Sequence, residues 1–122
     1  MADLIPFDDR EGKIWFDGKL IDWRDAKVHV LTHGLHYASS VFEGERSYGG
    51  NIYRKHEHNK RLFNSAEILG FTIPWTMEEL AKARHDVLKA NGIVDGYVRP
   101  VAWRGSEMMG VSAQHNTIHV AI

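Results

Sequence analysis

The chain has 122 residues, 43% of them hydrophobic and 25% charged, and its formal net charge is −1. These values are typical of one globular domain with a modest core, and they exclude the strongly basic surface that nucleic acids or acidic membranes attract. Cysteine is absent, which excludes disulfides and thiolate chemistry. Because the first ten residues carry four charged residues and no apolar stretch, and no run approaches the roughly 20 apolar residues of a membrane span, we expect a cytoplasmic protein.

The first 31 residues predict a polar arm followed by short strands. Residues 1–12 are polar and are expected to form a flexible arm, which places the domain itself at residues 13–122. Asp17-Gly18 separates Ile14-Trp15-Phe16 from Lys19-Leu20-Ile21, and this dipeptide accepts the positive φ angles of a tight turn, so a hairpin is predicted there. Residues 28–31, Val-His-Val-Leu, form a short apolar run that suggests another strand.

A second hairpin is predicted over residues 40–54. Residues 40–48 alternate in type with a period of two, as a strand with two different faces does. Residues 49–51, Gly-Gly-Asn, then turn the chain into a short apolar segment. The strand would carry Val41, Glu43 and Glu45 on one face and Phe42, Gly44, Arg46 and Tyr48 on the other.

Two amphipathic helices are predicted in the middle of the chain. Residues 56–69 carry apolar side chains at helical spacing, and Gly70 ends this helix. Residues 76–91 begin with a capping box of Thr76 and Glu79. The buried stripes would be Leu62, Phe63, Ala66 and Leu69 in the first helix and Leu80, Ala83, Val87 and Leu88 in the second.

Two further strands are predicted after the helices. Residues 97–103 form the first, and Pro100 predicts an edge or an interruption because it cannot donate a ladder hydrogen bond. Residues 117–122 form the second, which stops without a turn or polar tail, so we expect the chain to continue in the intact protein. The order of strands, two helices and strands predicts an α+β domain with an antiparallel or mixed sheet packed with two main helices.

Motif searches restrict the chemistry. The sequence has no G-x-S-x-G, Walker A or G-x-G-x-x-G pattern. The neighbouring histidines His29, His33 and His36 lack a zinc-binding signature, so no metal site is expected.

Three arginines are candidates for anion binding. Arg46 shares a strand face with Phe42, and Arg99 shares one with Tyr97. A guanidinium beside an aromatic ring suits carboxylate recognition, although an arginine on the solvent side of a strand is the commoner case. Arg61, in the first helix, either extends to solvent or reaches an anion.

Five blocks, in order from Lys13 onward, carry a family pattern together. They are W-F-D-G (15–18) with D-A-K-V-H-V (25–30), H-G-L-H-Y (33–37) with S-V-F-E-G (40–44), H-E-H (56–58) with R-L (61–62), Y-V-R-P (97–100), and M-G-V (109–111). The set resembles the opening of the branched-chain amino-acid aminotransferases, and five ordered blocks are specific where a single block is not.

The resemblance implies the amino-terminal, small domain of a fold-type IV enzyme that uses pyridoxal 5'-phosphate. Such enzymes transfer the amino group of leucine, isoleucine or valine to 2-oxoglutarate in branched-chain amino-acid biosynthesis. The family's Schiff-base lysine and the carboxylate that pairs with the pyridine nitrogen lie in a carboxy-terminal domain, which we expect to be absent here. No residue of this chain is therefore expected to be catalytic, and the chain alone is expected to be inactive and to lose the cofactor.

The resemblance also implies roles for individual residues. Arg61 matches the arginine that binds the cofactor phosphate. Phe42 matches an aromatic wall of the pocket for the branched side chain. Arg99, with Tyr97 beside it, matches the arginine that binds the distal carboxylate of glutamate.

The expected partners follow from the same resemblance. Tyr37 and Val111 match residues that reach into the pocket of a neighbouring subunit, which implies a dimer. The other expected partners are amino acids, 2-oxo acids and the chain's own carboxy-terminal domain, with neither nucleic acid nor membrane among them.

Two alternatives stay open. The chain would be a free-standing binding or interaction module if it had no catalytic half, but retention of the pocket residues disfavours this. D-amino-acid aminotransferases and aminodeoxychorismate lyases share the fold, and the Y-V-R-P and F-E-G blocks favour the branched-chain type.

Overall fold

Residues 4–122 are described by the computed structural model, and they form eight strands, three α-helices and one 3-10 helix. The strands are β1 (Lys13–Phe16), β2 (Lys19–Asp22), β3 (Ser40–Phe42), β4 (Glu45–Tyr48), β5 (Asn51–Ile52), β6 (Gly96–Val98), β7 (Val101–Arg104) and β8 (Ile118–Ala121). The helices are η1 (Trp23–Asp25, 3-10), α1 (His33–Tyr37), α2 (Lys55–Ile68) and α3 (Met77–Ala90). All strand pairs are antiparallel, in a five-stranded sheet ordered β2-β1-β8-β7-β3 and a three-stranded sheet ordered β5-β4-β6. The predicted α+β class is confirmed.

Both predicted hairpins are confirmed at their turns. Asp17 (φ 49°) and Gly18 (φ 100°) join β1 to β2. Positive φ at both central positions matches the twist of a two-residue hairpin. Gly49 (φ 60°) and Gly50 (φ 84°) do the same between β4 and β5.

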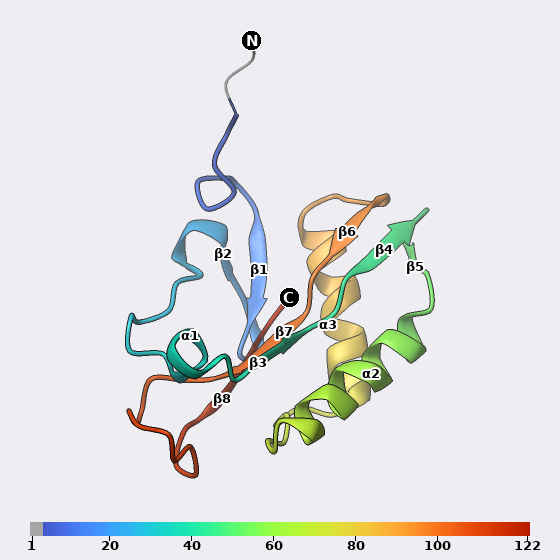
Figure 1. Cartoon of the computed structure of the whole chain (residues 1–122). Helices are drawn as coiled ribbons and strands as arrows, with labels where there is room; N and C mark the ends of the chain where they lie inside the picture. Colours follow the sequence, from blue (N-terminus) through green and yellow to red (C-terminus); the bar gives the residue numbers. More distant parts are fainter. Residues whose placement is uncertain (1–3) are drawn as a thin grey trace.

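Each of the two long predicted strands is divided between the two sheets. The alternation predicted over 40–48 is confirmed, because buried and exposed side chains alternate along it, but the strand breaks between β3 and β4. The strand predicted over 97–103 breaks between β6 and β7, which confirms the interruption predicted from Pro100. The two breaks face each other, since the Glu43 N–H donates to the Pro100 carbonyl over 3.0 Å. The paired segments bend there from one sheet into the other (Figure 1).

The two main predicted helices are confirmed, and they cover one side of the sheets. α3 begins with the predicted capping box, in which Thr76 and Glu79 exchange side-chain to backbone hydrogen bonds of 3.0 Å. α2 ends at its C-cap Leu69, which is exposed although the sequence placed it in the buried stripe. Figure 1 shows α2 and α3 side by side, with α1 on the other side of the strands. The main core side chains are Trp15, Val41, Ile52, Leu62, Ala66, Leu80, Ala83, Leu88, Val98, Ala102 and Val120.

A buried ion pair joins α2 and α3 to the smaller sheet. The hydrophobic pattern of the sequence does not indicate it. The side chains of Arg84 on α3 and Glu45 on β4 are 0% exposed. Arg84 Nε and Nη2 donate to the two Glu45 carboxylate oxygens over 2.8 and 2.9 Å. Arg84 Nη1 donates to Asn59 Oδ1 on α2 and to the Leu80 carbonyl. The guanidinium therefore fixes the positions of three elements relative to one another.

The prediction of a strand over residues 28–31 is wrong. These residues have no ladder partner, and Val28 and Val30 are exposed. The segment lies on the face of the larger sheet that α2 and α3 leave uncovered, where Val28 lines a cavity with Phe16 of β1 and Trp103 of β7. A short apolar run that packs across a sheet has the same composition as a strand within it, so its local pattern cannot separate the two.

The predicted arm lies partly outside the described residues, because residues 1–3 are not among them. Residues 4–12 form neither helix nor strand, and Arg24 of η1 pairs with Asp9 and Glu11 over 2.7 and 2.8 Å. The flexibility of the arm stays a prediction. Within residues 4–122, no helix has the length and apolar character that crossing a bilayer requires.

Arg84→Met is expected to destabilise the domain, because it leaves the Glu45 carboxylate buried without a partner. The free energy of unfolding, measured by urea denaturation, should fall by roughly 3–5 kcal/mol. Adding Glu45→Leu should recover most of that loss. The control Lys82→Ala removes an exposed pair with Asp86 on the same helix and should cost less than about 1 kcal/mol. Equal losses in the single and double variants would contradict the role of the pair.

Candidate functional site

The bend between the two sheets brings functional candidates together from two distant segments. Phe42 ends β3, Glu43 follows it, and the paired segment contributes Tyr97 in β6 and Arg99 directly after it. The side chains of Phe42, Tyr97 and Arg99 thus meet where neither segment continues its ladder, while the Glu43 side chain is buried and contacts α2 instead. The interruption that Pro100 imposes is what places them there.

Arg99 is held against two aromatic side chains. Its guanidinium carbon lies 4.1 Å from the centroid of the Phe42 ring, a cation–π distance. Arg99 Nε and Nη2 donate to the Tyr97 hydroxyl over 2.9 and 2.8 Å. A Cβ at Gly44 would collide with that hydroxyl, so the glycine leaves room for it. Since a guanidinium has five N–H donors, three remain for an incoming carboxylate.

Arg61 forms a forked pair with a buried carboxylate. Arg61 Nε and Nη2 donate to the two oxygens of Glu43, each over 2.8 Å. Glu43 is 4% exposed, whereas the Arg61 side chain is 65% exposed. His58, three residues earlier on α2, places Nδ1 2.7 Å from Glu43 Oε1. One edge of the Arg61 guanidinium is therefore fixed by the protein and the rest is open to solvent.

The electrostatics of this pair follow from its geometry. The hydrogen bond from Arg61 holds the pKa of Glu43 below its ordinary value, against burial, which would raise it, and with further help from His58. The same hydrogen bond, accepted by Glu43, raises the pKa of Arg61. Glu43 is therefore ionised and Arg61 charged across the physiological range.

Tyr37 and Val111 lie together in a different part of the molecule. Both line a cavity of about 710 Å³ between α1, the start of the segment after α2, and the loop 105–117. His33 organises this region, with Nδ1 2.6 Å from Ser39 Oγ and Nε2 3.0 Å from the Gly110 carbonyl. The rings of His33 and Tyr37 lie 4.5 Å apart. The predicted site residues thus fall into two groups, one at the bend and one at this loop.

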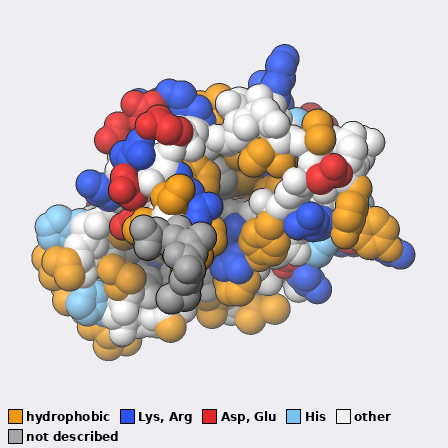
Figure 2. Space-filling view, turned by 90° about the horizontal axis from the view of Figure 1, so that it is seen from above, with side chains coloured by type: hydrophobic (Ala, Val, Ile, Leu, Met, Phe, Trp, Pro, Cys, Tyr) orange, Lys and Arg blue, Asp and Glu red, His pale blue; other side chains and the backbone are white. Residues whose placement is uncertain are grey.

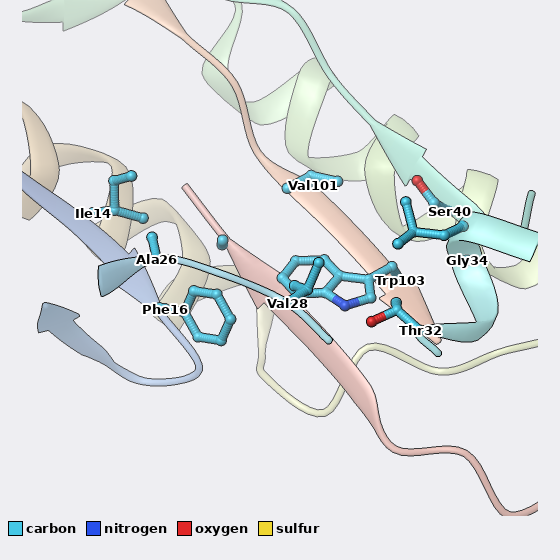
Figure 3. Close-up of a pocket in the computed structure, with 11 residues that line it drawn as sticks. Ile14, Phe16, Ala26, Val28, Thr32, Gly34, Ser40, Val101 and Trp103 are labelled. Carbon is cyan, nitrogen blue, oxygen red and sulfur yellow. The ribbon is translucent and has the colours of Figure 1, made fainter. Parts of the chain in front are cut away.

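Two further hollows have apolar walls. Tyr97 and Arg99 line a cavity of about 660 Å³ between α3 and the larger sheet, beside Val101 and Ile122. A second cavity, of about 350 Å³, lies on the uncovered sheet face, where Figure 3 shows Phe16, Val28 and Trp103 gathered at its wall. Figure 2 shows apolar side chains reaching the surface among intermixed acidic and basic ones at the end that carries the amino terminus.

Sequence reasoning missed the polar residues that hold the predicted ones. Glu43 orients Arg61, His58 shares Glu43, and His33 anchors the loop of Val111. The alternation places Glu43 on the same strand face as the apolar Val41, and a carboxylate on a buried face needs a partner, so this shared face was the available signal. Arg46 lies exposed on β4 over the Tyr48 ring, apart from these contacts. Among residues 4–122, no three His, Cys, Asp or Glu side chains are grouped as a metal site requires.

Comparisons with known proteins agree on one family. A family model described as amino-transferase class IV matches residues 40–122. The branched-chain-amino-acid aminotransferase of Pseudomonas aeruginosa is 45% identical over 118 residues, which are 93% of this chain and 38% of that protein. The chain therefore spans about two fifths of the length of this curated relative.

The fold of this chain is also similar to solved structures of branched-chain amino acid aminotransferases. The branched-chain amino acid aminotransferase of Escherichia coli has a TM-score of 0.87 and 38% identity over 92% of this chain and 38% of its own. A second branched-chain amino acid aminotransferase, complexed with N-(5'-phosphopyridoxyl)-L-glutamate, has a TM-score of 0.85 and 41% identity over 92% of this chain and 40% of its own. The enzyme of the archaeon Thermoproteus uzoniensis, solved with norvaline, has a TM-score of 0.85 and 38% identity over 92% of this chain and 39% of its own.

Glu43→Gln is expected to weaken the fold at neutral pH and to remove an acid-sensitive contribution. Because the pKa of Glu43 is lowered in the folded protein, its stabilisation is present above the ordinary carboxyl pKa of about 4.3 and is lost as pH falls through the lower folded value. The variant should lose about 1–2 kcal/mol at pH 7 and less at pH 3.

Urea denaturation at both pH values provides the measurement. Glu57→Gln, which alters an exposed carboxylate 3.8 Å from Arg54, is the matched control and should behave as the unmodified chain. A loss from Glu43→Gln that is the same at pH 3 and pH 7 would show that ionised Glu43 has no special partner.

Proposed function

The chain belongs to the class IV aminotransferase family, and on that premise we propose that residues 13–122 are the amino-terminal, small domain of a branched-chain-amino-acid transaminase. The enzyme would transfer the amino group of leucine, isoleucine or valine to 2-oxoglutarate with pyridoxal 5'-phosphate. The observation that carries the proposal is the pair of oriented arginines, with Arg61 held by Glu43 and Arg99 held by the Tyr97 hydroxyl against the Phe42 ring. The identity of about 45% to the Pseudomonas aeruginosa enzyme supports the same activity.

Arg61 suits the phosphate group of the cofactor. A phosphate dianion is bound best by a permanently charged, forked donor. The two bonds to Glu43 use two of the five donors of Arg61, so three are left, and the side chain is 65% exposed. Glu43 holds the guanidinium in one orientation before the phosphate arrives, which reduces the entropy that binding would otherwise cost.

Arg99, Tyr97 and Phe42 suit the two kinds of substrate side chain. Arg99 has free donors for the distal carboxylate of glutamate, and the Tyr97 hydroxyl fixes its orientation. Phe42 offers an apolar ring to the branched side chain of leucine, isoleucine or valine. One pocket would then accept an anionic and an apolar side chain in alternate half-reactions.

When bound, pyridoxal phosphate supplies the electron sink that accepts the electron pair left as the α-proton departs. The residues of this chain would bind the phosphate, orient the substrate and exclude water. We assign the lysine that carries the cofactor, and the carboxylate for its pyridine nitrogen, to the part of the relatives' length that this chain does not match. The relatives are more than twice as long as their match to this chain, which leaves room for such a domain.

The exposed apolar surface suits two partners, the remaining domain and a second subunit. Val30, Leu35 and Val111 are well exposed, and the apolar cavity of Figure 3 lies on an uncovered sheet face. Tyr37 and Val111 would reach the pocket of the second subunit in a homodimer. A cytoplasmic location is part of the same proposal, because an enzyme of amino-acid biosynthesis meets its substrates there.

The first test compares the chain with a chimera in which it replaces the matching segment of the Pseudomonas aeruginosa enzyme. The chain alone should form no glutamate from leucine and 2-oxoglutarate, because it lacks a lysine at the family's catalytic position. The chimera should form glutamate. A folded, cofactor-loaded chimera without this activity, or activity in the chain alone, would overturn the proposal.

The second test concerns cofactor affinity in the chimera. Arg61→Ala should raise the pyridoxal phosphate concentration needed for half-maximal activity about 10- to 100-fold, as expected for loss of a charge-assisted bidentate contact. Arg46→Ala, which removes another exposed arginine, is the control and should leave that concentration unchanged. An Arg61→Ala variant that binds the cofactor normally would remove Arg61 from the phosphate site.

A further inference from the structure

His119 lies between two carboxylates that come from distant parts of the chain. His119 Nδ1 is 2.5 Å from Asp17 Oδ2, in the turn between β1 and β2. His119 Nε2 is 3.2 Å from Glu107 Oε2, in the loop 105–117. The imidazole also stacks on the Trp103 ring, with centroids 5.7 Å apart. A single side chain on β8 thus connects a hairpin turn to a long loop.

Both carboxylates are held in place by bonds that do not involve His119. The Val120 N–H donates to the second oxygen of Asp17 over 2.9 Å. The Thr117 N–H donates to the second oxygen of Glu107, also over 2.9 Å. A Cβ at Gly105 would collide with both His119 Nε2 and Glu107 Oε1, so the backbone leaves room for their contact. The imidazole therefore enters a preformed gap between two fixed acceptors.

The charge state of His119 decides whether both contacts exist. A neutral imidazole carries one N–H, whereas an ionised carboxylate only accepts, so bonds to both Asp17 and Glu107 need the imidazolium. On deprotonation the shorter contact, to Asp17, keeps the remaining proton. The ring nitrogen that faces Glu107 then presents a lone pair to a carboxylate, and the bridge to the loop is lost.

The surroundings of His119 contain other charges. Lys27 and His29 line the same cavity, of about 190 Å³, together with Glu107 and His119. Burial by itself would lower the pKa of His119, but the hydrogen bonds to Asp17 and Glu107 outweigh it and raise the pKa above its ordinary value. A raised histidine pKa gives stabilisation that is complete below about pH 6.5 and is lost as pH rises through the folded value.

The loop that this bridge reaches carries Val111. Other hydrogen bonds also hold this loop: the His33 N–H donates to the Gly105 carbonyl over 2.8 Å, His33 Nε2 contacts the Gly110 carbonyl, and Asn116 Nδ2 donates to the Gly105 and Met108 carbonyls. These attachments do not connect the loop to the β1–β2 turn. Loss of the His119–Glu107 contact would therefore remove the connection between the loop and the β1–β2 turn and leave Glu107 with its bond from the Thr117 N–H, while the contacts of His33 remain.

We propose that protonated His119 is a positioning residue that connects the loop 105–117, and with it Val111, to the β1–β2 turn, and that this connection is lost when His119 gives up its proton. The contacts of His119 with Asp17 and Glu107 are made within this chain and do not depend on the proposed function. Only the consequence for substrate binding, through the placement of Val111 at a neighbouring pocket, rests on the proposed function.

Amide hydrogen exchange of the chain between pH 6 and pH 9, corrected for the intrinsic rates, tests this connection without cofactor or substrate. Protection of the Thr117 amide and of residues 106–112 should fall roughly threefold to tenfold across the titration of His119. In His119→Gln, which cannot become charged, protection should be low at every pH. In His29→Gln, which alters the other histidine of the cavity, the loop amides should still lose protection from exchange as the pH rises.

A second variant covers the case in which His119→Gln does not fold. Glu107→Gln keeps an acceptor for the Thr117 N–H but removes the charge that favours the imidazolium, so the fall in loop protection should shrink and the His119 pKa, followed by NMR, should decrease. Protection that does not change with pH in the unmodified chain, or a change that persists in His119→Gln, would overturn the inference. Because neither result involves transamination, failure here and failure of the proposed function are separate outcomes.

Discussion

The bidentate pair between Arg61 and Glu43 connects α2 to the bend between the two sheets. The carboxylate is buried where the chain leaves one sheet for the other, and the arginine reaches it from α2. A buried carboxylate without a partner would be costly, so the pair both stabilises the bend and fixes one guanidinium in a known orientation. The same bend places Arg99 on the Phe42 ring. Fold stability and the proposed anion binding thus share one structural cause.

The two faces of the larger sheet have different roles. α2 and α3 cover one face and supply the core, and the Arg84–Glu45 pair connects them to the smaller sheet. The other face carries the segment 28–31, α1 and the loop 105–117, and it exposes apolar side chains around two cavities. An exposed apolar face beside a loop attached by only a few polar contacts is what a surface made for partners is expected to look like.

The sequence predicted features that depend on local pattern. The Asp17-Gly18 turn, the capping box of Thr76, the alternation over 40–48 and the interruption at Pro100 are each encoded within a few residues. The partners of Glu43 and Arg84 were not predicted, because each pair joins residues far apart in the chain and an inward-facing charge does not name its partner. The bridge at His119 spans 102 residues to Asp17 and left no local signal. The roles of Arg61, Arg99 and Val111 came from family resemblance and remain predictions.

The most direct measurement is a crystal structure of the chimera bound to N-(5'-phosphopyridoxyl)-L-glutamate. We expect Arg61 to keep both bonds to Glu43 while its free donors lie within hydrogen-bond distance of the phosphate oxygens. A phosphate held by other residues, or an Arg61 side chain that leaves Glu43 and points away from the ligand, would contradict this expectation.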